Sequence, residues 1–237
     1  MGSTGNGKKS TSQVVDLASL PEVDQLNKIM QLQVEMGQTG FEAGDPNESP
    51  NGKLYVNTGK SWVINTYLNS DGKTMDTPNT DWDDLVSESW VKDAIKKIDA
   101  GMKPMSQSVQ TSRFLSANAA SKMLGIQITD NFINALAEGK GVGAKELKKN
   151  FADMLGGLDY THKAYTSTTY SGKHGSYDKY PVKLNMVIKK GTDAIVTNNH
   201  KEYEIVVGRN KKYNFTKKFH VESLSNGKKQ LVIDVVI

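Results

Sequence analysis

The chain of 237 residues contains no cysteine. This absence excludes disulfide bonds, a cysteine nucleophile and thiolate zinc sites, although it does not fix the compartment in which the protein acts. The four histidines show none of the close spacings that zinc motifs use, so we expect no protein metal site. No apolar run reaches membrane-spanning length, and the first residues lack the apolar segment of a signal peptide, so we expect no membrane association.

Arginine is scarce, because Arg113 and Arg209 are the only arginines among otherwise lysine bases. The 30 basic and 26 acidic side chains give a formal net charge of +4, which is too small to indicate nucleic-acid binding by itself. Arginine offers a planar fork of donors that matches carboxylates and phosphates. Its use at just two positions marks both as candidates for binding an anion.

Length and periodicity indicate one α+β domain after a short leader. Residues 1–19 are rich in Gly, Ser, Thr and Lys, and predict a disordered leader or linker. Residues 20–237 should form the folded domain, helical over about 20–160 and β-rich over about 105–237. Apolar spacing predicts helices over 20–36, 61–69, 82–100, 117–124, 130–137 and 144–155. Alternation predicts strands over 110–115, 164–170, 182–189, 194–197, 202–207, 211–221 and 230–237.

Glu202 and Glu204 stand two residues apart at the start of the predicted strand 202–207. In a strand, residues i and i+2 project from the same face, which would hold both carboxylates roughly 7 Å apart. Tyr203 would lie on the opposite, buried face. Two carboxylates in a cleft can divide the work of catalysis, one stabilising positive charge and the other accepting a proton. The alternative is a solvated strand edge that carries two incidental acids.

Two further signals precede this pair. Arg113 lies near the end of the predicted strand 110–115, and a later strand carries the hydroxyl side chains of Ser167, Thr168 and Thr169. Each signal has an ordinary explanation, since a single arginine often forms a surface ion pair and threonine is frequent in strands. The ordered set of three signals is more informative than any of them alone.

In this order, Arg113, the stretch 167–169 and the stretch 202–204 resemble the motifs of the arginine-serine-glutamate class of mono-ADP-ribosyltransferases. This class includes the enzymes of actin-modifying binary toxins and transferase domains of some phage minor head proteins. The predicted helix around 63–68, with the sequence VINTYL, is similar to an early helix of the family. The resemblance covers roughly residues 55–237. One departure is Thr169, where the family usually has serine.

The resemblance implies an α+β fold of N-terminal helices followed by two packed, mostly antiparallel sheets, with NAD⁺ bound in the cleft between them. Glu204 would stabilise the oxocarbenium-like centre that forms when nicotinamide leaves. Glu202 would prepare an arginine of the target, and Arg113 would bind the pyrophosphate. Ser167 would orient both Arg113 and Glu204.

The resemblance also implies further contacts with the two substrates. The cofactor would be contacted by the hydroxyl strand and the loop after it, through Thr168, Thr169, Tyr170, Tyr177 and Tyr180. Asn199 and His200, just before the two acids, would recognise the acceptor. A plain polar hairpin loop is an equally good interpretation of these last two residues.

We therefore expect transfer of ADP-ribose from NAD⁺ to an arginine of a target protein, with release of nicotinamide and without a metal. The choice of arginine rests on Glu202, because family members with glutamate at this position modify arginine. Two alternatives remain open: a non-catalytic binding module on the same fold, and ADP-ribosylation of a nucleic acid or another acceptor. We expect a monomer that acts in the cytoplasm of a target cell after secretion or delivery by a virion.

Overall fold

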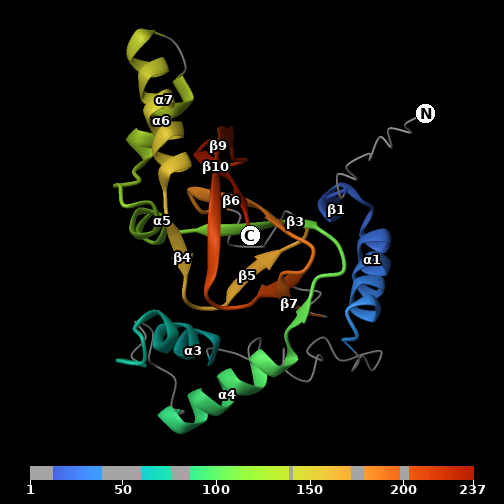
Figure 1. Ribbon diagram of the computed structural model, residues 1–237. Coiled ribbons are helices and arrows are strands. Elements are labelled where there is room, and N and C mark those ends of the chain that lie inside the picture. The colour runs from blue at the N-terminus through green and yellow to red at the C-terminus, as the bar shows by residue number, and fades with distance from the viewer. Residues whose placement is uncertain (1–12, 39–59, 76–85, 139–140, 172–178, 198–202) are drawn as a thin grey trace, which may run out of the picture.

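The computed structural model describes residues 13–38, 60–75, 86–138, 141–171, 179–197 and 203–237 (Figure 1). Its helices are a 3₁₀ turn (Leu17–Ser19), α1 (Glu22–Glu35), α3 (Lys60–Asn69), α4 (Glu88–Gly101), α5 (Ala117–Leu124), α6 (Asp130–Glu138) and α7 (Val142–Gly157). Its strands are β1 (Val15–Asp16), β2 (Lys103–Pro104), β3 (Val109–Leu115), β4 (Tyr160–His162), β5 (Thr166–Thr169), β6 (Val182–Ile188), β7 (Asp193–Val196), β8 (Glu204–Val207), β9 (Lys211–Ser223) and β10 (Lys229–Val236). None of the helices in the described ranges is long and apolar enough to cross a membrane.

The strands form one hydrogen-bonded path in the order β2-β7-β8-β5-β3-β6-β10-β9-β4, and β1 adds to β3. Neighbours are antiparallel, except for the parallel pairs β6–β10 and β1–β3. The predicted α+β class is confirmed. The two predicted sheets, however, are joined, because Ser112 of β3 pairs with Thr169 of β5. In the described part of the chain, β3 and β5 are joined by this single residue pair. The sheet therefore consists of two halves, β2-β7-β8-β5 and β3-β6-β10-β9-β4, that meet at this point.

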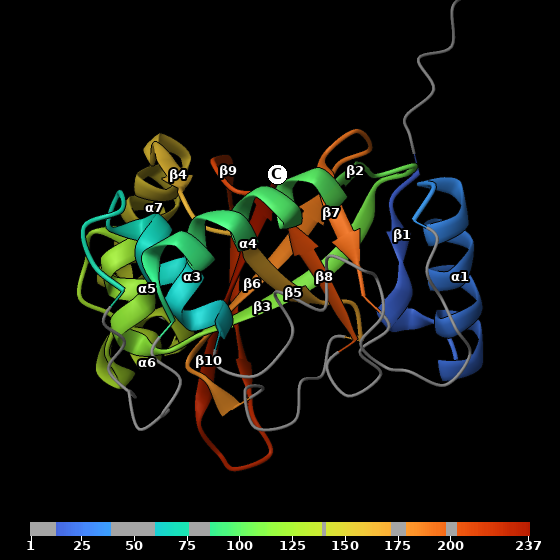
Figure 2. The same ribbon diagram turned by 90° about the horizontal axis from the view of Figure 1, so that it is seen from below.

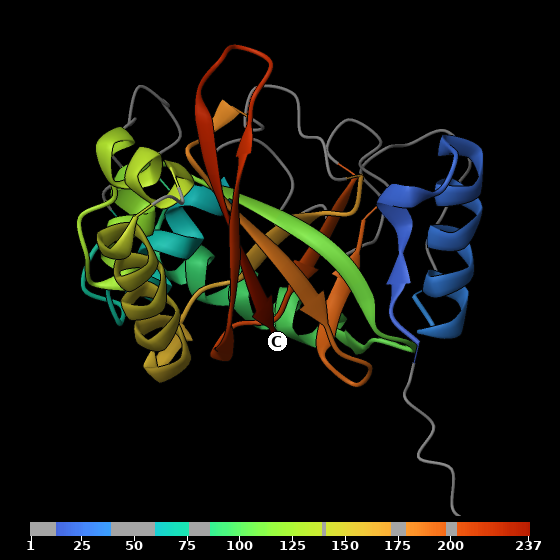
Figure 3. The same ribbon diagram turned by 90° about the horizontal axis from the view of Figure 1, so that it is seen from above.

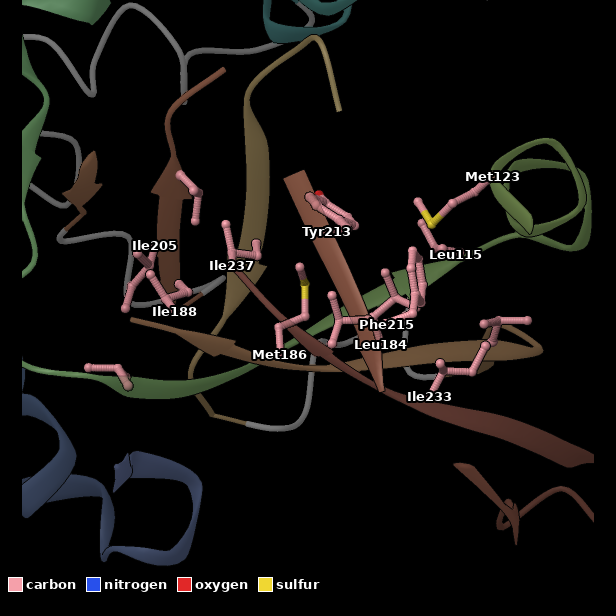
Figure 4. Packing of buried hydrophobic residues seen from close by; sticks show 14 of the residues in the cluster. Leu115, Met123, Leu184, Met186, Ile188, Ile205, Tyr213, Phe215, Ile233 and Ile237 are labelled. Carbon is pink, nitrogen blue, oxygen red and sulfur yellow. The ribbon is translucent and has the colours of Figure 1, made fainter. Parts of the chain in front are cut away.

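One large apolar core holds the two halves together (Figure 4). Every second residue of β6 is 0% exposed, because one face of the strand points into this core: Val182, Leu184, Met186 and Ile188. Ile205 of β8 comes from the other half and belongs to the same core as Ile188 (Figure 4). Burial of such side chains contributes about 1.5–3 kcal/mol each, so this shared core keeps the two halves in contact.

Helices α3 and α4 cover the opposite face of the β7-β8-β5 half (Figure 2). Ile64 of α3 and Ile98 of α4 are buried there together with Ile195 of β7 and Val206 of β8. The start of α4 is fixed by Ser87, whose hydroxyl accepts a hydrogen bond from a first-turn N–H at 3.2 Å. The β7-β8-β5 half is therefore covered on both faces.

Helix α1 lies beside β7, where that strand extends past its short partner β2, at the end of the molecule opposite α5, α6 and α7 (Figures 1 and 3). The side chain of Gln33 donates a hydrogen bond to the carbonyl of Val196 at 2.8 Å. The Gln38 amide donates to the carbonyl of Ala194 at 2.8 Å and accepts from the N–H of Val196 at 3.1 Å. Two side-chain amides thus take the place of a neighbouring strand along part of this edge.

Three predicted boundaries differ from the structure. The predicted leader is too long, because Val15 forms β1 and Leu17 is fully buried, whereas residues 1–12 lie outside the described ranges. The helix predicted over 82–100 begins at Glu88, and its first predicted residues, up to 85, are not described. The strand predicted over 202–207 begins at Glu204, because Tyr203 has a φ of 50°, which interrupts strand alternation.

Candidate active site

Glu204, the first residue of β8, is held by a neighbouring serine. Only 4% of the residue is exposed, and its Oε1 accepts a hydrogen bond from the hydroxyl of Ser167 on β5. In the antiparallel register Thr169 stands opposite Glu204, and Ser167 stands opposite Val206. Ser167 and Glu204 are therefore diagonal neighbours on one face, within reach of each other because of the register.

The Ser167–Glu204 pair lies on the face of the sheet that α3 and α4 cover. Val206, two residues after Glu204, points the same way and packs against Ile64 of α3 and Ile195 of β7. The helix α3 includes the VINTYL stretch that resembles the early family helix. This helix and the buried carboxylate thus belong to the same side of the sheet.

The main chain on both sides of Glu204 is fixed by hydrogen bonds. The N–H and the hydroxyl of Thr197 donate to the Glu204 carbonyl at 3.1 Å and 3.0 Å. The Tyr203 carbonyl accepts from the N–H of Tyr170 at 2.9 Å, and the two rings pack edge to face at 5.5 Å. The Tyr203 hydroxyl donates to Glu22 of α1 at 2.7 Å, and this bond raises the pKa of Tyr203. Helix α1 therefore supports the turn that leads into Glu204.

The second acid, Glu202, lies outside the described residues, and so do Tyr177, Asn199 and His200. We expected Glu202 and Glu204 to share one face of a strand. That geometry does not follow from the structure, because the strand begins at Glu204 and Tyr203 has a left-handed backbone. Strand alternation therefore gives no position for Glu202.

The other hydroxyl residues of β5 divide between its two faces: Thr169 lies on the face of Ser167 and Glu204, and Thr168 on the opposite face. Thr168 is 3% exposed, and its hydroxyl donates to the carbonyl of Ile205 at 2.9 Å, because its register places it on the core side of the sheet. Thr169 shares a hydrogen bond of 3.1 Å with Ser171. Tyr170 is 1% exposed, and burial raises its pKa. Thr168 and Tyr170 are thus buried in the sheet, which differs from the cofactor contacts that the resemblance implied.

Arg113 lies one residue beyond the pair Ser112–Thr169, where β3 and β5 diverge. Its side chain leaves the strand on the core face, opposite to the face of Ser112. Its Nη1 atom is buried and has no hydrogen-bond partner among the described residues. We expected Ser167 to orient both Arg113 and Glu204. Among the described side chains, the Ser167 hydroxyl bonds to Glu204, and no bond joins it to Arg113.

A buried aromatic cluster lies beside Arg113 and was not predicted from the sequence. Tyr160 of β4 pairs with Tyr213 of β9, and their ring centroids are 5.4 Å apart. His162 lies 5.6 Å from Tyr213, and its Nδ1 shares a hydrogen bond of 3.0 Å with the Tyr160 hydroxyl. The Tyr213 hydroxyl bonds to Thr166 at 2.5 Å, which ties β9 to β5. Burial and the nearby charge of Arg113 lower the pKa of His162 to about 3, so its imidazole is neutral.

The second arginine, Arg209, has a structural role. Its Nε and Nη2 atoms lie 2.9 Å and 2.8 Å from Oδ2 of Asp99, and the Tyr165 hydroxyl donates to the same carboxylate at 2.6 Å. This network ties the end of α4 to β5 and to the turn after β8. Arg113, by contrast, forms no ion pair within the described part of the chain. In the same ranges, no three His, Asp or Glu side chains gather as metal ligands do.

Comparison with known families identifies the chain. The model of the ADP-ribosyltransferase exoenzyme family matches residues 46–237, which contain β3, β5 and β8. The chain belongs to this family. No curated protein matches the sequence significantly. Membership in the ADP-ribosyltransferase exoenzyme family confirms the resemblance seen in the motifs, and supports NAD-dependent transfer of ADP-ribose.

Solved structures with a similar fold are ADP-ribosylating toxins of this kind. Plx2a, a toxin from Paenibacillus larvae, is 17% identical with a TM-score of 0.61, and the match covers 89% of this chain and 93% of Plx2a. C3stau2 from S. aureus, solved with NAD, is 19% identical with a TM-score of 0.58, covering 89% and 94%. BECa of a C. perfringens binary enterotoxin, solved with NADH, is 17% identical with a TM-score of 0.62, covering 90% of this chain but 48% of BECa. At such identities the likeness shows the fold.

Proposed function

We propose that the protein transfers the ADP-ribose unit of NAD⁺ to an arginine side chain of a target protein and releases nicotinamide. The observation that carries this proposal is the buried Glu204 carboxylate, held by Ser167 in a member of the ADP-ribosyltransferase exoenzyme family. The nucleotides in two structures of similar fold, NAD with C3stau2 and NADH with BECa, support a dinucleotide as the donor.

On the donor side, Glu204 acts at the nicotinamide ribose. Positive charge develops on this ribose as its C1′–N bond to nicotinamide breaks, and a carboxylate beside it stabilises that charge. Glu204 is 4% exposed and held by Ser167, so its charge is oriented before the reaction and little screened by water. Loss of a comparable preorganised group lowers kcat roughly 10²- to 10³-fold in other enzymes.

The pyrophosphate of NAD⁺ binds at Arg113. The buried Nη1 atom of Arg113, without a partner among the described residues, is a donor that a phosphate oxygen satisfies. The divergence of β3 and β5 begins at the pair Ser112–Thr169, directly before Arg113. Arg113 leaves β3 on the core face, whereas Glu204 lies on the other face of the sheet, so a dinucleotide that reaches both would have to pass through the opening between β3 and β5.

The proposed acceptor of the ADP-ribose unit is an arginine side chain. A guanidinium has a pKa above about 12 and is a poor nucleophile until it is aligned or loses a proton. As a guanidine nitrogen forms its bond to C1′, Glu202 takes the proton from that nitrogen and passes it to solvent. Asn199 and His200 position the acceptor. The proposed place of action is the cytoplasm of a target cell.

Nicotinamide release from NAD⁺ tests both halves when it is measured with and without agmatine, a small guanidine acceptor. Glu204→Gln should abolish release under both conditions. Glu202→Gln should keep the slow hydrolysis of NAD⁺ but lose the acceleration by agmatine. Glu146→Gln, which removes an exposed carboxylate on α7, is the matched control and should behave as wild type.

Three other outcomes have distinct meanings. Release that agmatine does not accelerate would keep the NAD⁺ chemistry and discard arginine as the acceptor. Equal loss of both activities in Glu202→Gln would contradict the division of roles between the two acids. A folded protein that neither releases nicotinamide nor binds NAD⁺ would favour a non-catalytic module on this fold.

A further inference from the structure

Arginine, the proposed acceptor, is rare in the enzyme itself. The chain has 30 basic side chains, and Arg113 and Arg209 are the arginines among them. Nη1 of Arg113 is buried, and the proposed function gives this side chain the pyrophosphate of NAD⁺. The side chain of Arg209 is 38% exposed, so a second molecule of the enzyme can approach it. Arg209 is therefore the position at which this chain would modify its own kind.

The guanidinium of Arg209 is fixed to one carboxylate at the end of α4. Its Nε and Nη2 atoms lie 2.9 Å and 2.8 Å from Oδ2 of Asp99, which engages the guanidinium along one edge. The hydroxyl of the fully buried Tyr165 donates to Oδ1 of the same carboxylate at 2.6 Å, so Asp99 is itself held in place. A forked pair with a carboxylate that is already oriented is among the more specific contacts that an arginine makes.

This pair makes Arg209 a poor acceptor for two reasons. The hydrogen bond to Asp99 and its negative charge raise the pKa of Arg209, whereas a guanidine nitrogen must give up a proton as its bond to C1′ of the ribose forms. In addition, the guanidinium must leave Asp99 before it can enter the site of a second molecule, because the pair engages the donors by which an acceptor would be aligned.

Arg209 also lies at the far end of β8 from Glu204. Strand β8 begins at Glu204, and the N–H of Gly208 still donates to the carbonyl of Asp193, the first residue of β7, at 2.9 Å. Four strand steps of about 3.3 Å thus separate Glu204 from Gly208, roughly 13 Å in all. Arg209 follows Gly208, so its guanidinium cannot reach the carboxylate of its own molecule. Any modification of Arg209 takes place between two molecules.

We propose that Arg209 is a latent automodification site, and that Asp99 holds it in a form that the enzyme does not modify. This inference rests on the proposed function, because it requires arginine as the acceptor. When the pair is broken, an Nη nitrogen of Arg209 bonds to C1′ of NAD⁺ in a second molecule. The C1′–N bond to nicotinamide breaks, nicotinamide leaves with the electron pair, and the proton of the guanidine nitrogen passes to solvent. The Asp99–Arg209 pair thus keeps the enzyme from spending NAD⁺ on itself.

A mixture of enzyme and inactive acceptor tests the assignment. The enzyme is the wild type with NAD⁺, and the acceptor is Glu204→Gln protein, distinguished from the enzyme by the mass of a tag. Asp99→Ala in the acceptor should raise the rate of ADP-ribose incorporation at least about fivefold in intact-mass spectra, the equivalent of about 1 kcal/mol for a partly exposed pair. Adding Arg209→Lys should remove that gain. Asp93→Ala is the matched control, because it breaks the exposed pair of Asp93 with Lys97 on α4 and releases no arginine.

Asp99→Asn gives a second release of Arg209 if Asp99→Ala does not fold, and should raise the rate in the same direction. The assignment is overturned by equal rates with and without the Asp99 carboxylate, or by incorporation that persists after Arg209→Lys. Agmatine in a parallel reaction separates the two proposals. Transfer to agmatine but not to the released Arg209 would remove this inference alone. Nicotinamide release without transfer to agmatine would remove arginine as the acceptor, and this inference with it.

Discussion

Replacing Ser167 with alanine should slow nicotinamide release without a comparable change in NAD⁺ binding. The substitution removes the hydroxyl that donates to Glu204, whereas the main-chain pairing of β5 with β8 stays intact. A hydrogen bond to a charged group contributes about 1.5–3 kcal/mol, and each 1.4 kcal/mol in a barrier is tenfold in rate. If the bond orients the carboxylate for the transition state, kcat should fall roughly 10- to 150-fold. KM for NAD⁺ should change much less, because Ser167 acts through Glu204.

Steady-state nicotinamide release over a range of NAD⁺ concentrations separates kcat from KM. Ser223→Ala is the matched control, because the exposed Ser223 hydroxyl at the end of β9 accepts a hydrogen bond from Lys229 at 2.7 Å, away from the site. Urea unfolding of both variants shows whether a loss of rate reflects a loss of folded protein. A kcat within twofold of wild type for Ser167→Ala would refute the reasoning, and so would a rise in KM with kcat unchanged.

Arg113→Lys keeps the charge but loses the forked donors, so KM for NAD⁺ should rise about tenfold in the nicotinamide assay while KM for agmatine stays constant; equal changes in both would contradict a specific phosphate contact. Asp99→Asn breaks the partly exposed bidentate pair with Arg209, and should lower the free energy of unfolding in urea by about 1 kcal/mol with kcat unchanged; a drop in kcat would give that pair a role in the site. The folded-state pKa of His162 lies near 3, below the 6.5 of a free imidazole, so the unfolded chain binds a proton that the folded protein does not between these pH values. The free energy of unfolding should therefore fall as the pH drops below 6.5, by up to about 1.4 kcal/mol per pH unit from this group. His162→Gln should lose that part of the slope in urea unfolding at pH 7 and pH 5, and an identical slope would show that the wild-type imidazole is protonated when folded.

Most of the long elements could be predicted because their periodicity is local. The alternation of Val182, Leu184, Met186 and Ile188 predicts β6 directly, and all four residues point into the core. The strands β1, β2 and β4 have only two or three residues, too few for any period to show. These short strands form because they pair with β3, β7 and β9, and such pairing depends on the tertiary structure and not on the local sequence.

The candidate site was predictable in its residue types but not in its geometry. The motifs indicated Ser167 and Glu204. Their hydrogen bond, however, depends on the register of β5 against β8, which brings together two residues that are 37 positions apart in the chain. Tyr203 carries no local mark of its left-handed backbone, because positive φ is rare outside glycine and asparagine. The position of Arg113 near the aromatic cluster could not be foreseen either, since His162 and Tyr213 meet through the pairing of β4 with β9.

The glutamine side chains that bond to the edge of β7, Gln33 of α1 and Gln38 just after this helix, set a limit on how far the protein can be shortened. The family match begins at residue 46, after the end of α1 at Glu35, so a protein trimmed to the matched residues would lose Gln33 and Gln38. Ala194 would still pair with Lys103 of β2, but the main chain of Val196 would lose its hydrogen bonds to both glutamines and would face water, where a strand from another molecule can pair with it. A trimmed enzyme should therefore keep the residues of the candidate active site and yet self-associate. In the intact chain, α1 and the residues just after it cover this strand edge and so oppose aggregation.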